Sequence, residues 1–85
     1  MLLGDTGFDL LEHALDQMKL REIREEDVIA VLQAATPFRY YQEGFEHEGY
    51  YNELTRLFVG TVDRQVVTVF RSRASYVAGL KRRMS

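Results

Sequence analysis

The chain has 85 residues, 46% hydrophobic and 28% charged, a composition typical of soluble proteins, and we expect a single domain over residues 1–85. It contains no cysteine, which excludes disulfide bonds and thiolate zinc sites. Its apolar stretches are shorter than the roughly 20 residues that span a bilayer, and no basic segment precedes an apolar one at the N-terminus. We therefore expect no membrane contact, no secretion signal and a cytoplasmic location.

The net charge of −2 is distributed unevenly along the chain. Residues 1–63 carry 13 acidic and 5 basic side chains, whereas residues 64–85 carry 6 basic side chains and no acidic one. A basic segment of this kind can attract a nucleic acid, or it can pair with the acidic helices of its own chain. The acidic total favours the second interpretation, because dedicated nucleic-acid binders are usually basic overall.

The first predicted element is a helix that begins near Phe8 and ends near residues 19–21. Asp5 or Thr6 can cap it, and its apolar residues recur at spacings of three and four, which predicts one face against the core. These apolar residues are Phe8, Leu11, Ala14, Leu15 and Met18. His13 lies away from the centre of this face, so it is the histidine that a helix would hold in a fixed position.

A second helix is predicted from Glu25 to Thr36. Three carboxylates at its start suit the positive end of the helix dipole, and Pro37 ends it because proline disfavours helical geometry in the residue before it. Residues 37–43 then read as a first strand, and residues 43–49 as an acidic turn.

Two further strands are predicted at residues 50–62 and 65–72, joined through Asp63-Arg64, since these segments are rich in valine, threonine and phenylalanine. Gly60 is expected to mark a bulge, and residues 74–84 form a short helix interrupted at Gly79. The order of elements predicts an α+β fold in which two N-terminal helices pack on a three- to four-stranded antiparallel sheet, closed by a short C-terminal helix.

Short motifs over residues 10–72 resemble a family of small bacterial domains, domain of unknown function 4258. They are His13-Ala14, Met18, Arg21, Ile23, Glu26, Asp27-Val28, Leu32, the proline after the helix, and Val-Val-Thr-Val-Phe at 66–70. This family is similar to the RelE and ParE toxins of toxin–antitoxin pairs, and several relatives are metal-independent ribonucleases. The chain departs from the family pattern at Gln17, where an arginine is common, and at Arg24, where a serine or threonine cap is usual.

The resemblance implies a site for cleaving RNA without a metal or another cofactor. Such a site needs groups that transfer protons and cations that stabilise the phosphate in the transition state. His13 is the candidate for proton transfer, and Arg21, Arg71 and Arg73 are the candidates for phosphate contacts. The structural alternatives are a histidine that fixes the first helix on the sheet and arginines that lie in solvent.

Other aromatic and polar residues also have side chains that are common in binding sites. Tyr40, Tyr41 and Tyr76 are candidates for stacking on a base or for contact with a partner. Glu46-His47-Glu48 has the composition of a metal site, but adjacent residues on an extended chain point to opposite faces, so we expect a flexible acidic loop and no metal.

Three functions follow as hypotheses. The first is a toxin-like, metal-independent ribonuclease that acts on RNA and is held in check by an antitoxin protein. The alternative is a small non-catalytic module that binds a partner protein or a second copy of itself as a homodimer. The third is simple nucleic-acid binding through residues 64–85, which would weaken steeply with salt.

Overall fold

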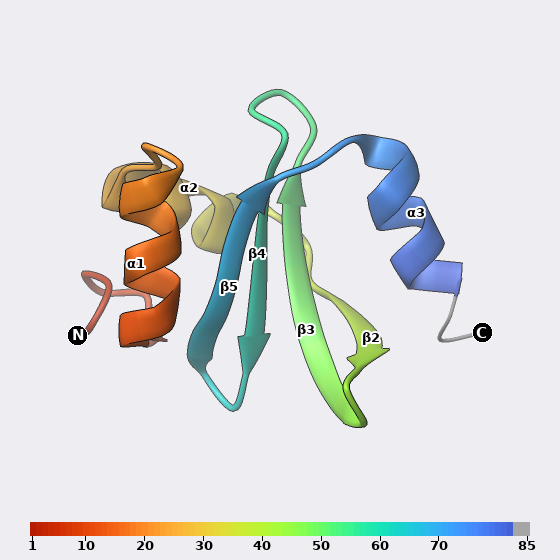
Figure 1. Ribbon diagram of the computed structural model, residues 1–85, viewed down its shortest axis with the longest axis horizontal. Helices are drawn as coiled ribbons and strands as arrows, with labels where there is room; N and C mark the ends of the chain where they lie inside the picture. Colours follow the sequence, from red (N-terminus) through yellow and green to blue (C-terminus); the bar gives the residue numbers. More distant parts are fainter. Residues whose placement is uncertain (83–85) are drawn as a thin grey trace.

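The computed structural model describes residues 1–82 and has the predicted α+β class (Figure 1). Its elements in chain order are β1 (Asp9–Leu10), α1 (Glu12–Leu20), α2 (Glu25–Ala34), β2 (Phe38–Gln42), β3 (Phe45–Asn52), β4 (Leu57–Val62), β5 (Gln65–Arg71) and α3 (Ala74–Arg82). The strands form one sheet in the order β1-β5-β4-β3-β2. None of the helices in residues 1–82 is long and apolar enough to cross a membrane.

The sheet has five strands and mixed directions, so the prediction of three or four antiparallel strands was wrong in both respects. Strands β2 to β5 are antiparallel neighbours, whereas β1 runs parallel to β5. The backbone N–H of Asp9 donates to the carbonyl of Arg64, and that of Leu11 donates to Val66. Because the edge of β5 binds the main chain here, α1 begins at Glu12 instead of near Phe8.

The segment predicted as an acidic turn is largely strand. Glu43 and Gly44 have φ values of 56° and 82°, as in a two-residue turn of the kind that suits a β-hairpin. The turn pairs Gln42 with Phe45 and starts β3 five residues earlier than predicted. The strand predicted over residues 50–62 is in turn divided by a loop between β3 and β4.

The connection between β4 and β5 is the predicted two-residue turn, with φ values of 48° at Asp63 and 65° at Arg64. Positive φ is unfavourable for arginine, but the Arg64 guanidinium lies 4.5 Å from the ring centre of Phe8 and donates to the carbonyl of Thr6. The predicted bulge is confirmed by a register shift between Gly60 and Thr61.

Helices α2 and α3 lie close to their predicted positions. Helix α2 begins at Glu25 as predicted and ends within two residues of the predicted boundary. Helix α3 runs through Gly79, so the predicted interruption there was wrong, because the buried side chains of Val77 and Leu80 hold the helix on the sheet on both sides of the glycine. The last two residues predicted for this helix, 83 and 84, lie outside the described residues.

The two faces of the sheet are covered differently. Helices α1 and α2 lie against one face and enclose a mainly aliphatic core, which includes Met18, Val31, Leu57 and Val59. Helix α3 lies on the other face, at the β2 side, over an aromatic cluster (Figure 1). This cluster contains Phe38, Tyr40, Tyr51, Phe58, Phe70, Val77 and Leu80. Since α3 covers only part of its face, side chains near the β2–β3 and β4–β5 turns stay open to solvent.

Candidate functional site

Helix α1 lies along the outer edge of β5, where side chains replace a neighbouring strand. Strand β1 pairs with only the first two residues of β5. Further along, Oε1 of Gln17 accepts hydrogen bonds from the backbone N–H of Val69 (3.2 Å) and the hydroxyl of Thr68 (3.1 Å). One turn later, Arg21, the residue that follows the last residue of α1, donates to the carbonyl of Val69 at 3.0 Å. Both backbone groups of Val69 on this edge are therefore satisfied by side chains of α1 and of the residue that follows it.

His13 is joined to the same network. Its Nε2 lies 3.0 Å from Nε2 of Gln17, one helical turn away. His13, Gln17 and Arg21 thus form a row at intervals of four residues on the side of α1 that meets β5. The His13 side chain is exposed, whereas Gln17 is half-buried.

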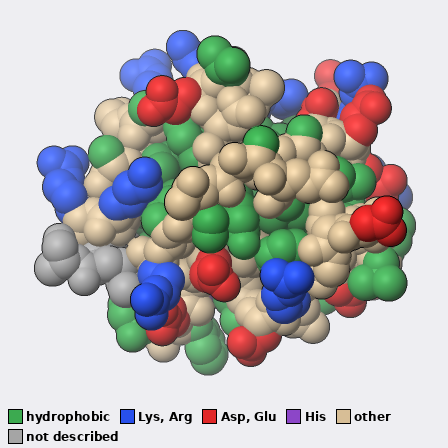
Figure 2. Space-filling model, turned by 180° about the vertical axis from the view of Figure 1, so that it is seen from behind, with side chains coloured by type: hydrophobic (Ala, Val, Ile, Leu, Met, Phe, Trp, Pro, Cys, Tyr) green, Lys and Arg blue, Asp and Glu red, His purple; other side chains and the backbone are tan. Residues whose placement is uncertain are grey.

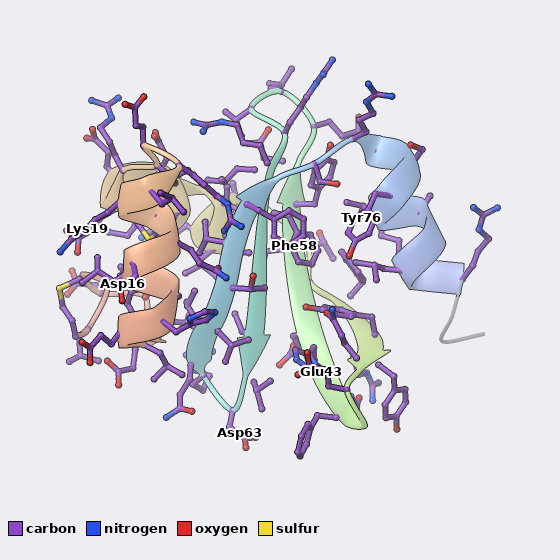
Figure 3. All side chains as sticks on the ribbon, in the orientation of Figure 1. Asp16, Lys19, Glu43, Phe58, Asp63 and Tyr76 are labelled. Carbon is purple, nitrogen blue, oxygen red and sulfur yellow. The ribbon has the colours of Figure 1, made fainter. Side chains whose placement is uncertain are left out.

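The sheet divides at the end that carries the β2–β3 and β4–β5 turns. The last pair between β3 and β4 is Glu48 with Thr61, but β3 continues with β2 and β4 continues with β5 beyond that point. Figure 1 shows β3 and β4 diverging toward this end. In Figure 3, the labelled side chains of Glu43 and Asp63 mark the two turns, and Asp16 and Lys19 point away from the sheet.

A cavity of about 510 Å³, which we call the histidine cavity, opens between α1 and the β2–β3 turn on the α3 side of the sheet. It is lined by His13, Gln17, Gln42, Glu43, Phe45, His47, Val62, Gln65, Val67, Thr68 and Phe70. Both histidines of the chain therefore line one cavity. Amides, a hydroxyl and two aromatic rings make up much of the remaining wall, a mixture suited to a polar ligand that carries a flat ring.

His47 lies in β3, opposite Tyr40 of β2. The two rings are stacked with their centres 5.0 Å apart. Nδ1 of His47 lies 3.0 Å from the carbonyl oxygen of Phe45, and the side chain is half-buried. The expectation of a flexible acidic loop at this position was wrong, because strand pairing and ring stacking hold His47 in place.

A second cavity lies beside the first, at the point where β3 and β4 diverge. It shares His47 and Val62 with the histidine cavity, and its other lining residues are Arg39, Glu46, Glu48, Thr61 and Asp63. Arg39 and Glu46 form an ion pair at 3.3 Å. Within residues 1–82, no group of three or more histidine, aspartate or glutamate side chains is arranged to hold a metal ion.

The three candidate arginines do not line the histidine cavity. Arg21 is held by the carbonyl of Val69, and Arg71 donates at 3.5 Å to the carbonyl of Arg21, at the C-terminal end of α1. Arg73 lies in another depression, beside Tyr51 and α3. The structure thus brings Arg21 and Arg71 together, whereas Arg73 lines a different depression.

Basic side chains near the end of the chain also have partners within the protein. Nζ of Lys81 lies 4.9 Å from the ring centre of Phe38, which places this charge over the aromatic cluster. Figure 2 shows several lysine and arginine side chains on the side of the molecule that carries α3.

The three candidate tyrosines have different surroundings. Tyr41 is 52% exposed on β2, and Tyr76 is 44% exposed on α3, where its ring packs edge-on against Phe70. Tyr76 points from α3 toward the sheet in Figure 3. Tyr40 is fully buried, which leaves it no surface for a ligand.

Tyr40 carries a buried hydroxyl without a hydrogen-bond partner among the described residues. Burial, and secondarily the neighbouring Tyr76, raises the pKa of this hydroxyl well above its usual value. A Cβ atom added at Gly60 would lie 2.5 Å from the hydroxyl oxygen, so β4 needs glycine to pass over the Tyr40 ring.

The sequence did not predict that His47 and Gln17 lie beside His13 in one cavity. The signal for His47 was the Glu43-Gly44 pair, which favours a hairpin turn and would have extended the strands on both sides. Gln17 carried no such signal, because its role depends on the register between α1 and the backbone of β5.

No family model, no curated protein and no solved structure gave a significant match to the chain.

Proposed function

We propose that the chain is a metal-independent, RNA-cleaving domain whose two histidines act in the histidine cavity. The observation that carries this proposal is that His13 of α1 and His47 of β3, 34 positions apart in the sequence, line one open cavity. The likeness to toxin-like ribonucleases noted from the sequence supports the same chemistry.

Histidine suits this reaction for a simple reason. Cleavage by the adjacent 2′-hydroxyl needs a base for the hydroxyl proton and stabilisation of the charge that grows on the phosphate. Imidazole can accept a proton at one nitrogen and donate a hydrogen bond from the other. Two imidazoles in one cavity can therefore supply both requirements without a metal ion.

The residues that line the cavity suit single-stranded RNA, whose bases are unpaired. Phe45 is 65% exposed at the rim, where an unpaired base can stack on its ring. Gln65 provides an amide donor and an amide acceptor for the edge of such a base. Among residues 1–82 no lysine or arginine lines the cavity, so the proposal gives Arg21, Arg71 and Arg73 no direct phosphate contact.

The test is to incubate the purified chain with single-stranded RNA in the presence of EDTA. We expect cleavage by the wild type and no cleavage by the double variant H13A/H47A. Lys19→Ala is the matched control, because Lys19 is also exposed on α1 but does not line the cavity. A folded wild type that leaves RNA intact, or a double variant as active as Lys19→Ala, would contradict the proposal.

A non-catalytic interaction module is the second candidate. Tyr41 and Phe45 are exposed on the β2–β3 hairpin, and β2 has no strand on its outer edge among the described residues. An exposed edge strand can pair with a second chain. A stable homodimer in solution that dissociates on Tyr41→Lys, with no cleavage of RNA, would favour this function over the first.

A further inference from the structure

The backbone of β5 fixes the orientation of the Gln17 side-chain amide. The backbone N–H of Val69 can only donate, and it faces one terminal atom of Gln17 at 3.2 Å. If that atom were the amide nitrogen, two donors would face each other. The carbonyl oxygen of Gln17 must therefore lie toward β5, and its NH₂ group must lie toward His13.

This orientation determines which nitrogen of His13 carries hydrogen. The NH₂ group of Gln17 can only donate, and its nitrogen lies 3.0 Å from Nε2 of His13. Nε2 must then accept, so the hydrogen of the neutral ring is on Nδ1. Nδ1 has no hydrogen-bond partner among the described residues, so its N–H is free to donate to a ligand.

His47 offers a hydrogen-bond acceptor to a ligand, whereas His13 offers a donor. Nδ1 of His47 lies 3.0 Å from the carbonyl oxygen of Phe45, and a carbonyl can only accept. Nδ1 of His47 therefore carries the hydrogen, and the lone pair of the neutral ring is on Nε2. Nε2 of His47 has no hydrogen-bond partner among the described residues.

We infer that Gln17 is a positioning residue that gives the two histidines different roles: His13 donates a hydrogen bond to the phosphate, and His47 accepts the proton of the 2′-hydroxyl. This inference rests on the proposed RNA-cleaving function. It assigns His13 a role other than the proton transfer expected from the sequence.

The reaction balances with these two groups and water. Nε2 of His47 takes the proton from the 2′-hydroxyl, the 2′ oxygen bonds to phosphorus, and the bond from phosphorus to the 5′ oxygen breaks. The leaving oxygen takes a proton from a solvent water, and the proton on His47 neutralises the hydroxide that results. The Nδ1–H of His13 donates to a non-bridging phosphate oxygen, where negative charge grows in the transition state.

The protonation pattern can be measured without any activity, by ¹⁵N NMR of the histidine rings at a pH at which both are neutral. We expect hydrogen on Nδ1 of His13 in the wild type. In Gln17→Glu, a carboxylate of the same shape still accepts from Val69 but can only accept from His13, so the hydrogen should move to Nε2. Hydrogen on Nε2 in the wild type, or no change in Gln17→Glu, would overturn the inference even if the protein cleaves RNA.

The kinetics of RNA cleavage test the positioning role of Gln17. Gln17→Glu should lower kcat for RNA cleavage by about 100-fold, the usual effect of losing one donor to the transition state, and change KM much less. Gln42→Glu is the matched control, because it adds the same charge to the same cavity without touching His13. An equal loss in Gln42→Glu would overturn the assigned role, since charge alone would then explain the effect. If the wild type cleaved no RNA, the proposed function would fail, and the positioning of His13 would be judged by NMR alone.

Discussion

The two faces of the sheet are built from the same four long strands, yet they have different surroundings. The face under α1 and α2 is closed by aliphatic side chains such as Leu57 and Val59, which are 1% and 0% exposed. The opposite face is closed by aromatic rings only under α3, and its remaining part contains the histidine cavity. Because strand residues alternate between faces, one set of strands stabilises the fold on one side and leaves polar groups open on the other.

Substitutions on the part of the sheet that α3 leaves uncovered should therefore change activity without changing stability. The largest effect is expected for His47→Ala, which should lower the rate of RNA cleavage by about 1,000-fold, within the range for loss of a general base. The free energy of unfolding should change little, since the side chain is only half-buried. Single-turnover cleavage and urea denaturation on the same sample measure both quantities. A large loss of stability with full activity would reverse the assignment of the two faces.

A substitution on the face under α1 and α2 should lower stability and leave activity unchanged. Leu57→Ala removes a buried side chain from the aliphatic core and should lower the free energy of unfolding by about 3 kcal/mol. The rate of cleavage per folded molecule should stay the same, because Leu57 does not line the cavity. Urea denaturation measures the free energy of unfolding. An unchanged unfolding midpoint would show that this face is not the main source of stability.

The aromatic cluster under α3 offers a finer test at Gly60. An added Cβ would lie 2.5 Å from the Tyr40 hydroxyl and 2.7 Å from Cγ2 of Thr68, so Gly60→Ala should lower the free energy of unfolding by about 2 kcal/mol. Tyr40→Phe in the same chain removes one of these two contacts and should recover part of the loss. A double-mutant cycle measures the coupling. Additive effects would show that the two residues are not in contact.

The smallest effect is expected for Tyr40→Phe alone. It removes a buried hydroxyl that has no partner, and it should raise the free energy of unfolding by about 1 kcal/mol at neutral pH. Chemical denaturation at several pH values measures this change. A clear loss of stability would show that the hydroxyl has a partner in solution.

The Tyr40 hydroxyl should also make the free energy of unfolding depend on pH. The pKa of Tyr40 in the folded state is raised above its usual value, mainly by burial, so the neutral form favours folding. The contribution of Tyr40 is fully present below about pH 10, the pKa of an unfolded tyrosine, and is lost as the pH rises above it. Wild-type stability should fall in this range, and Tyr40→Phe should fall less steeply. The raised pKa of Tyr50 adds a decline of the same sign to both proteins.

The sequence predicted those parts of the fold whose signals are local. The carboxylates at Glu25 and the proline at residue 37 predicted α2, and the two-residue turn at Asp63-Arg64 predicted the β4–β5 hairpin. Strand β1 was missed because its two residues depend on hydrogen bonds to β5, more than 50 positions away. The same limit applies to the candidate site. His13 was identified from its helix, whereas His47 and Gln17 acquire their roles only through strand pairing and contact with β5.

The proposed reaction is tested most directly with a DNA oligonucleotide that contains one ribonucleotide, incubated with the wild-type chain in EDTA. Attack by the 2′-hydroxyl predicts a single cut on the 3′ side of that ribose, with a 2′,3′-cyclic phosphate on one product and a 5′-hydroxyl on the other. The all-DNA oligonucleotide should stay intact. Cleavage of the all-DNA control, a requirement for added metal, or an intact chimeric oligonucleotide with folded protein would contradict the account.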